Sequence, residues 1–251
     1  MAQWATKRRF LYGGSFVIIV TLIFGGIFWK VFYNTPTCTD GKKNSDETGI
    51  DCGGSCKLLC TSDALAPVVL WSKVFNVSDN LYTVVAYIQN PNINSKNVKA
   101  NYEFRIFDAS NKLITVKSGQ TSIPKNKKFA VFEVGIVLKN VKPKSADFEF
   151  TSFSSWQKDT TKEPEISIKH STLLDTTTTP HLEGTITNNS FSTISSIELD
   201  AFVLDDKENV LGASRTFVDN LDSRTSQNFV FTWPKLFDRD ASVVTVIYRA
   251  L

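Results

Sequence analysis

The sequence predicts an all-β fold class, with two tandem β-sandwiches that follow one N-terminal transmembrane helix and a small disulfide-rich segment. Three observations support this organisation. Residues 10–29 carry no charged side chain. All four cysteines of the chain fall between Cys38 and Cys60. After Cys60, apolar and polar residues alternate in short stretches separated by clusters of Asn, Asp, Ser and Pro, and this period of two is typical of β-strands.

The uncharged segment predicts a membrane anchor. At roughly 1.5 Å per residue it spans about 30 Å, the thickness of the hydrocarbon core of a bilayer. Lys7, Arg8 and Arg9 precede it, and positively charged residues stay on the cytoplasmic side of the membrane. We therefore expect a cytoplasmic tail over residues 1–9, a single-pass signal anchor in the lipid of the cell membrane over residues 10–33, and an extracytoplasmic chain over residues 34–251.

The alternative to an anchor is a cleaved secretory signal. The apolar region of such a signal has about 7–15 residues and ends in small residues. Here residues 27–33 are bulky and largely aromatic, and no Ala-x-Ala site follows. This pattern favours the uncleaved anchor, with Trp29 and Tyr33 at the membrane interface.

The net charge of +3 belongs to the anchor region. Residues 1–33 contain Lys7, Arg8, Arg9, Lys30 and no acidic residue, so 24 basic and 25 acidic residues remain in the rest of the chain. The basic balance of the whole chain is thus a topology signal, and we expect no nucleic acid among the partners.

The cysteines admit two interpretations, a metal site and a pair of disulfides. Cys38, Cys52, Cys56 and Cys60 have the spacing C-x13-C-x3-C-x3-C with no histidine nearby, whereas structural zinc sites usually show two close pairs. On the oxidising side of a membrane, disulfides are favoured. Three connectivities are open. A unit this short cannot bury a core of its own, so we expect residues 34–61 to form a disulfide-stapled spacer.

The residues between the cysteines carry a recognisable pattern. The segment contains Cys38-x-Asp40-Gly41, then Asn44, Glu47 and Asp51, and ends in Cys52-Gly53-Gly54-x-Cys56. It resembles a cysteine-rich motif, C-x-D-G-x-x-N-x-x-E-x-x-x-D-C-G-G-x-C, of exported and cell-surface bacterial proteins. The last spacing, Cys56-x3-Cys60, is one residue longer than the C-x2-C of that motif. The resemblance implies a bacterial surface protein.

Four of these residues offer oxygen ligands. Asp40, Asn44, Glu47 and Asp51 are spaced three or four apart between glycines, and this composition could hold calcium. Their spacing is not that of an EF-hand. In the other interpretation these side chains cap turns in a loop without a core, as Asp and Asn commonly do. No other cofactor is indicated.

The rest of the chain contains one unit of roughly 90 residues twice. Residues 100–106 and 197–203 are matching strands. Asn90 precedes Asp108 by 18 residues, and Asn188 precedes Asp205 by 17. Both aspartates end the alternating strand and are followed by a polar turn and two aliphatic residues. We expect copy A over residues 64–155 and copy B over residues 163–251, with Leu199 and Val203 facing the core of copy B.

The length of one copy suits a seven-stranded immunoglobulin-like sandwich. The residues Gly184-Thr-Ile-Thr-Asn188-Asn-Ser190, Phe202-Val-Leu-Asp205 and Val210-Leu-Gly212 resemble the FxLYD family. Those are small exported β-sandwich domains related in shape to the late-embryogenesis-abundant and WHy proteins. Copy A departs from the pattern, because it has Phe104-Arg-Ile-Phe-Asp108 and lacks the glycine after Ile114.

The boundary between the copies and their charges lead to two further expectations. Residues 154–164 are polar and end in Pro164, so they are interpreted as a linker. Residues 61–161 contain 13 basic and 8 acidic residues, whereas residues 162–251 contain 8 and 13. These opposite charges suggest weak self-association, in which copy B of one molecule docks on copy A of another. Contact of copy A with anionic lipid, or drift between duplicates, are the alternatives.

No catalytic motif is found. The chain has no G-x-S-x-G, no phosphate loop and no H-E-x-x-H, and His170 and His181 are interpreted as surface loop residues. We therefore expect a membrane-anchored, non-enzymatic protein that acts as a surface binding or envelope-assembly module with an unidentified envelope or surface protein as its partner. The alternative is an envelope stress or maintenance factor, which only the resemblance to WHy proteins implies.

Overall fold

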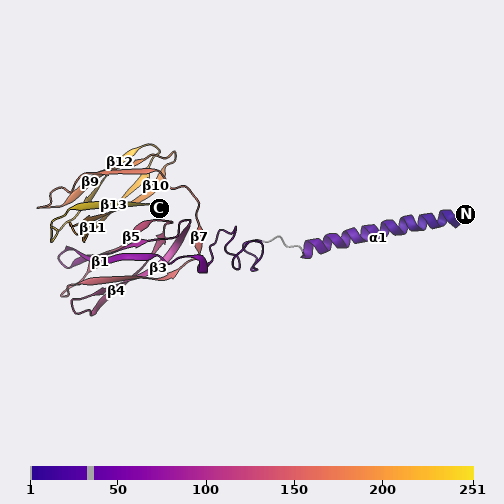
Figure 1. The fold of residues 1–251 in the computed structure, drawn as a ribbon, viewed down its shortest axis with the longest axis horizontal. Coiled ribbons are helices and arrows are strands. Elements are labelled where there is room, and N and C mark those ends of the chain that lie inside the picture. Colours follow the sequence, from indigo (N-terminus) through magenta and orange to yellow (C-terminus); the bar gives the residue numbers. More distant parts are fainter. Residues whose placement is uncertain (1, 33–36) are drawn as a thin grey trace. The chain divides into compact units, whose positions relative to one another are not determined.

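The computed structural model describes residues 2–32 and 37–251, in two compact units, Met1–Cys56 and Lys57–Leu251 (Figure 1). Tyr33, expected at the membrane interface, and residues 34–36 of the predicted spacer lie outside the described residues.

The first unit contains one long helix, α1 (Ala2–Phe32). Its segment Lys7–Lys30 has a mean hydropathy of 2.1, and none of this segment is buried. The core helix of a globular domain would be covered by other residues. An uncovered apolar helix of this length is typical of a membrane anchor or of a signal peptide. The hydroxyls of Ser15 and Thr21 donate to the carbonyl oxygens of Leu11 and Val17 at 2.8 and 2.9 Å, so neither hydroxyl brings an unpaired polar group into an apolar medium.

The second unit opens with a short 3-10 helix, η1 (Thr61–Asp63), and continues as antiparallel sheets. In copy A one sheet has the order β1 (Val68–Ser78), β2 (Leu81–Gln89), β5 (Lys128–Val137). The other sheet has the order β4 (Leu113–Ile123), β3 (Ser95–Phe107), β6 (Ser145–Phe153), and β7 (Trp156–Lys158) also pairs with β3.

Copy B repeats the order of strands β1–β6, without a counterpart of β7 among the described residues. One of its sheets has the order β8 (Ile166–His170), β9 (His181–Asn188), β12 (Ser226–Thr232). The other has the order β11 (Val210–Leu221), β10 (Ile194–Leu204), β13 (Val243–Ala250). The two tandem sandwiches that the sequence predicts are therefore confirmed, but the described residues of copy B form six strands rather than the seven that its length suggested.

The paired aspartates occupy the same turn in both copies. Asp108 accepts hydrogen bonds from the backbone N–H of Ser110 and Lys112 at 2.8 and 3.0 Å. Asp205 accepts them from Lys207 and Asn209 at 3.0 and 2.8 Å. These carboxylates close the hairpins β3–β4 and β10–β11.

Each sandwich has its own apolar core between its two sheets. In copy A the core contains Phe104, Ile106 and Phe129. In copy B it contains Leu199 and Val203, which are fully buried. The expected core-facing side of this strand is therefore confirmed.

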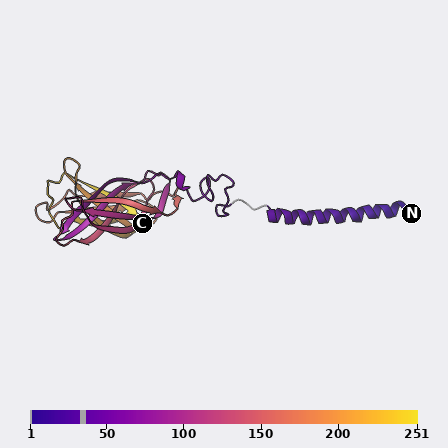
Figure 2. The same cartoon turned by 90° about the horizontal axis from the view of Figure 1, so that it is seen from below.

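A third apolar cluster joins the two sandwiches, and the sequence analysis did not foresee it. Val85, Ala130 and Phe202 are buried in it. They come from the outer faces of sheet β1–β2–β5 and sheet β11–β10–β13. Four sheets therefore stack in layers with three apolar interfaces. Figure 1 shows copy B on one side of copy A, and the two copies overlap when seen from below in Figure 2.

Part of the predicted linker is ordered. Within residues 154–164, strand β7 pairs with β3, and Trp156 is buried in the core of copy A at 4% exposure. Asp159 of the same segment is bound by Lys96 and Lys125 at 2.8 and 3.3 Å. The polar composition of residues 154–164 suggested a linker without fixed contacts. Instead, the buried Trp156 and the ion pairs of Asp159 hold this segment against copy A.

Candidate functional site: the groove between the sandwiches

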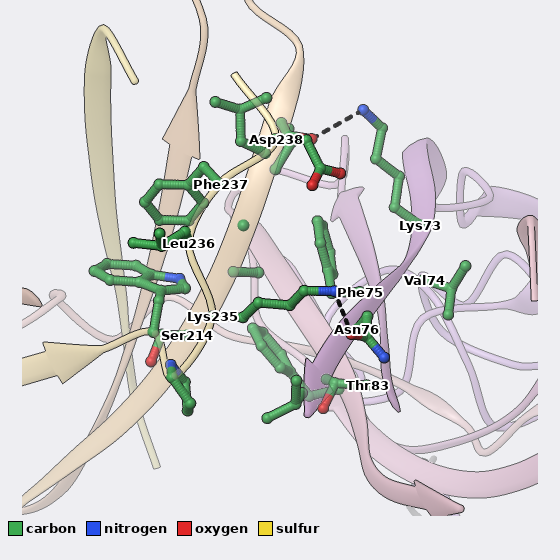
Figure 3. Close-up of a pocket in the computed structure, with 18 of the residues that line it drawn as sticks. Lys73, Val74, Phe75, Asn76, Thr83, Ser214, Lys235, Leu236, Phe237 and Asp238 are labelled. Atoms are coloured by element: carbon green, nitrogen blue, oxygen red, sulfur yellow. Dashed lines mark hydrogen bonds between the residues drawn. The ribbon is translucent and has the colours of Figure 1, made fainter. Parts of the chain in front are cut away.

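A groove of about 790 Å³ lies where the two sandwiches meet (Figure 3). Copy A contributes residues 72–77 of β1 and parts of β2, β5 and β6. Copy B contributes residues 209–215, mainly of β11, and the loop 232–239. Its volume falls within the range of ligand pockets, about 300–1,000 Å³.

Two sheet edges form the walls. β1 and β11 each pair with a strand on one side only. The Nζ of Lys73 in β1 lies 3.3 Å from the carbonyl oxygen of Val210 in β11, so the two edges lie side by side. Residues 71–77 of β1 are all half-buried rather than alternately buried and exposed. The strand is covered on both faces, because Val74 packs against the core of copy A, and Trp71 and Phe75 pack against the cluster between the sandwiches.

Aromatic side chains line the groove beside the walls. Phe75 and Phe132 come from copy A, and Trp233 and Phe237 come from copy B. Gly212 of β11 allows the copy B pair to lie close, because a Cβ there would meet Phe237 at 2.6 Å and Trp233 at 3.1 Å. This is the glycine of the V-L-G pattern that copy A lacks.

Three lysines give the groove an excess of positive charge. They are Lys73, Lys144 and Lys235, and Asp238 is the one carboxylate among the lining residues. Lys235 donates from Nζ to the side-chain oxygen of Asn76 at 2.7 Å, and Lys73 donates to a backbone carbonyl. Among the described residues, none of the three has a carboxylate oxygen within 4.0 Å of its Nζ. Burial lowers the pKa of Lys73, and Asp205 opposes this shift.

Two polar atoms of the lining are buried without a hydrogen-bond partner, the Oγ of Ser72 and the Nε1 of Trp233. Trp233 is only 5% exposed. A buried indole N–H usually finds an acceptor, because leaving it unpaired costs free energy. Both atoms are almost fully covered by protein, so the polar groups that the groove offers to acceptors are its lysines.

A buried ionic network supports the copy B wall. Arg215 donates from Nε to Asp200 at 2.7 Å and lies 3.0 Å from Glu198. Arg249 lies 2.8 Å from the other oxygen of Glu198. Two carboxylates and two guanidiniums compensate one another here, as buried charges require.

The same arginines bind copy A. Arg215 donates to the carbonyl oxygen of Ala130 at 3.0 Å and stacks over the ring of Phe132 at 4.3 Å. Arg249 donates to the carbonyl oxygen of Ser122 at 3.0 Å. The network thus fixes the orientation of one sandwich on the other, and with it the width of the groove.

Burial raises the pKa of Asp200 to about 6, although its bonds with Arg215 lower it. The pKa of Asp205, near the groove, is lowered to about 2, first by the side-chain hydrogen bond from Asn209. Asp205 also accepts a hydrogen bond from Arg239 at 3.1 Å. Asp205 is therefore ionised at neutral pH.

The cysteines are oxidised, as predicted. Cys38 and Cys56 form a disulfide, and Cys52 and Cys60 are disulfide-bonded as well, so no cysteine is free. The sequence left three connectivities open, and the structure selects the one that contains the pair Cys38–Cys56.

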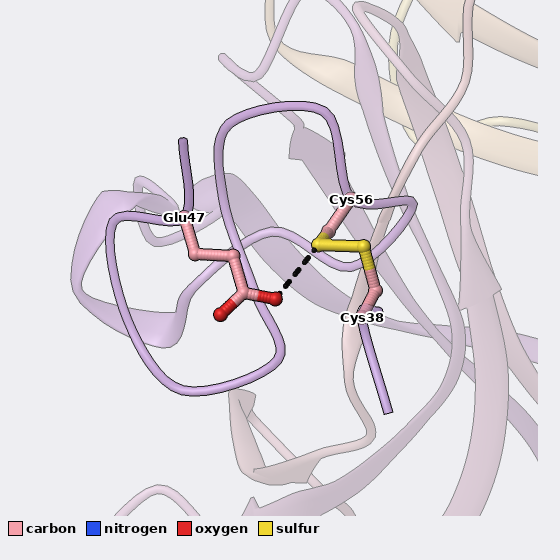
Figure 4. Close-up of side chains that lie close together, drawn as sticks. All are labelled: Cys38, Glu47 and Cys56. Carbon is pink, nitrogen blue, oxygen red and sulfur yellow. Dashed lines mark hydrogen bonds between the residues drawn. A yellow bond between two sulfur atoms is a disulfide. The ribbon is translucent and has the colours of Figure 1, made fainter. Parts of the chain in front are cut away.

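Glu47 lies against this disulfide, with Oε1 3.3 Å from the Sγ of Cys56 (Figure 4). Cys38, Glu47 and Cys56 are also the one group of three or more metal-ligating residue types whose ligand atoms all lie within 4.8 Å of one another in the described chain. Oxidised sulfurs are not thiolates, so this group does not form a zinc site.

The three carboxylates among the four predicted oxygen ligands accept hydrogen bonds within turns, whereas the Oδ1 of Asn44 is buried without a hydrogen-bond partner. Asp51 accepts from the N–H of Gly41 at 3.0 Å, and Glu47 accepts from the N–H of Asn44 at 3.2 Å and of Asp51 at 3.3 Å. Asp40 accepts from the side chain of Asn44 at 2.8 Å, which lowers the pKa of Asp40. Each carboxylate thus already has hydrogen-bond donors, as the turn-capping interpretation expects, and calcium binding stays a prediction.

The histidines flank a loop of copy B. His170 ends β8, and His181 begins β9 with Nδ1 3.5 Å from the carboxylate of Asp175. Both lie at strand ends rather than in the loop where the sequence analysis put them.

Sequence reasoning missed the groove and its ionic network. One signal was present. Residues 81–88 and 201–204 are almost continuous apolar runs, and such runs are typical of strands buried on both faces. The chemistry of Glu198, Asp200, Arg215 and Arg249 had no local signature, because their contacts depend on how the sheets stack.

No family model and no curated protein matches the chain. Among solved structures, red sea bream transglutaminase is similar at 11% identity and a TM-score of 0.20, over 73% of this chain. The match spans 31% of the transglutaminase chain.

Proposed function

We propose that this protein is a membrane-anchored, extracytoplasmic, non-enzymatic module that binds an envelope or surface protein. The observation that carries this proposal is the groove between the sandwiches, with its aromatic lining and its lysines without carboxylate partners. A site of this composition suits recognition, because apolar side chains supply contact area and a few polar groups fix orientation.

The anchor and its orientation are supported by two features. The helix segment Lys7–Lys30 is apolar and uncovered, and Lys7, Arg8 and Arg9 lie at its N-terminal end. Disulfides persist mainly in oxidising compartments, which agrees with an exported position of the cysteines.

Topology is tested with the full chain carrying an epitope tag at each end. Protease added to intact, wall-stripped cells should remove the C-terminal tag and leave a small N-terminal stub in the membrane. Full protection of the C-terminal tag would refute the extracytoplasmic placement. Loss of the N-terminal tag from the mature protein would show a cleaved signal instead of an anchor.

Binding is tested by cross-linking in intact cells and capture of the full chain. We expect recovery of an envelope or surface protein, and less of it with Lys73→Glu. Recovery of no partner, combined with protection of a client protein from aggregation, would instead favour the envelope stress role.

A further inference from the structure

We infer that the groove receives an extended acidic polypeptide segment, which adds as a strand to the free edge of β1. This inference rests on the proposed function and names the chemistry of the partner.

The first step is the edge itself. In an antiparallel sheet, a strand with one neighbour leaves half of its backbone N–H and C=O groups pointing away from the sheet. β1 pairs with β2 alone in its sheet, and residues 72–77 line the groove consecutively. Such an edge is a template for an added strand, and peptide recognition by strand addition uses it. Six residues of strand correspond to about 20 Å of edge.

The second step is charge. Lys73, Lys144 and Lys235 lie along the groove without carboxylate partners in the described chain. Arg215 and Arg239 also reach the lining, but both are already paired with carboxylates of copy B. One carboxylate, Asp238, also lines the groove, so the lysines outnumber it three to one. The unpaired positive charge comes from both walls, so it favours an acidic occupant between them.

The third step is the lining. Phe75 and Phe132 offer apolar contact from copy A, and Phe237 offers it from copy B. A strand presents alternate side chains to opposite sides, so a segment that alternates acidic and apolar residues can satisfy the lysines and the aromatic lining together. An anionic polymer without apolar side chains would leave the aromatic lining unused.

The test uses the full chain in lipid nanodiscs and a fluorescent peptide of about eight residues that alternates glutamate and valine. We expect saturable binding by fluorescence anisotropy. A peptide with proline in place of two central valines should bind at least about tenfold more weakly, because proline removes ladder N–H groups. A peptide with lysine in place of glutamate should not bind.

Variants locate the site. The double variant Lys73→Glu, Lys235→Glu should weaken binding by about tenfold or more. The matched control, Lys117→Glu with Lys169→Glu, reverses two exposed lysines on β4 and β8, away from the groove lining, and should bind as the unmodified chain does. Circular dichroism should be the same for both variants.

Three outcomes would overturn the inference. They are no saturable binding of the peptide, equal binding of the proline peptide, and an equal loss in the control variant. Binding of polyphosphate without binding of the peptide would reassign the groove to an anionic polymer, and salt-dependent self-association of the chain without peptide binding would assign it to a second copy. None of these results changes the tag and protease experiment, so failure of this inference is distinguishable from failure of the proposed anchor and export.

Discussion

Two buried asparagines hold equivalent loops in the two sandwiches. Asn90, after β2, donates from Nδ2 to the carbonyl oxygens of Ser95 and Pro124 at 3.0 and 2.7 Å. Asn188, at the end of β9, donates from Nδ2 to those of Ser192 and Leu221 at 2.8 and 3.1 Å. Each asparagine thus joins the end of one strand to the loops that lead into two others, across the two sheets of its sandwich.

Replacement of one of these asparagines should lower the stability of the fold. Asn188→Ala leaves buried carbonyl groups without donors, so the free energy of unfolding should fall by about 2 kcal/mol or more. Chemical denaturation of the chain measures this change. The matched control is Asn189→Ala, an exposed neighbour, which should change the free energy by less than about 0.5 kcal/mol. Equal effects of the two substitutions would contradict the role of Asn188.

Asp200 should give the fold an unusual pH dependence. Its pKa is raised from a usual value of 3.8 to about 6 by burial, so the folded state holds this proton more tightly than the unfolded chain does. Its contribution to stability is therefore fully present below about pH 4 and is lost as the pH rises through about 6. A carboxylate with a lowered pKa, such as Asp205, has the opposite pH dependence, because its contribution to stability is lost as the pH falls.

The variant Asp200→Asn tests this sign. The difference in unfolding free energy between the variant and the unmodified chain should shift in favour of the variant between about pH 4 and 6, by an amount on the order of 1–3 kcal/mol. Denaturant titrations across this range measure it. A difference that stays constant with pH would show that Asp200 titrates normally.

At the scale of elements, the cysteine-rich segment and the sandwiches depend on different forces. Residues 37–56 contain no strand longer than a single bridge, Gly49 to Cys52. Their turns require glycine at two positions. A Cβ at Gly53 would clash with the side chain of Thr48, and one at Gly54 would clash with the backbone of Asp46. The disulfides replace the apolar core that this segment lacks.

Reduction should therefore disorder the segment and leave the sandwiches folded. With a reducing agent, the far-UV circular dichroism of the β-structure should be unchanged, because the cores of copies A and B contain none of the disulfides. Proteolysis between Cys38 and Cys56 should become faster. The double variant Cys38→Ser, Cys56→Ser should behave as the reduced chain does. Broad loss of the β-signal would contradict this separation.

At the scale of the whole molecule, residues 57–251 form a single compact unit rather than two separate domains. Phe202 of copy B is central to the contact between the two sandwiches, because its ring packs against Trp71 and Tyr87 of copy A at centroid distances of 5.1 and 5.0 Å. Ion pairs within the chain also neutralise part of the excess positive charge of copy A. Lys125 and Lys127, two of the lysines that make copy A basic, pair within the chain with Asp159 and Glu163. Weak self-association through these lysines stays a prediction.

Phe202→Ala tests the coupling of the two copies. It should lower the unfolding free energy by about 3–5 kcal/mol and expose the outer face of sheet β1–β2–β5, so that Trp71 fluorescence shifts towards that of a solvated tryptophan. Phe191→Ala, at a side chain that is 85% exposed, is the control and should change neither readout. An unchanged Trp71 environment in Phe202→Ala would mean that the sandwiches are held together elsewhere.

The sequence by itself determined what depends on neighbours along the chain. The uncharged span, the four clustered cysteines, the period-two strands and the repeated Asn and Asp positions all have local physical causes, so the helix, the disulfides and the two sandwiches could be predicted. Leu199 and Val203 could be placed in a core because alternation assigns a face.

Only the tertiary structure decided what covers the second face of a strand. The alternation of apolar and polar residues does not predict that Phe202 packs against Trp71. Nor does it predict that Trp156, in a polar segment, is buried in the core of copy A. The groove exists because two sheet edges from distant parts of the chain come together, with Lys73 beside Val210. Its lysines and aromatic residues become one site only when the four sheets stack.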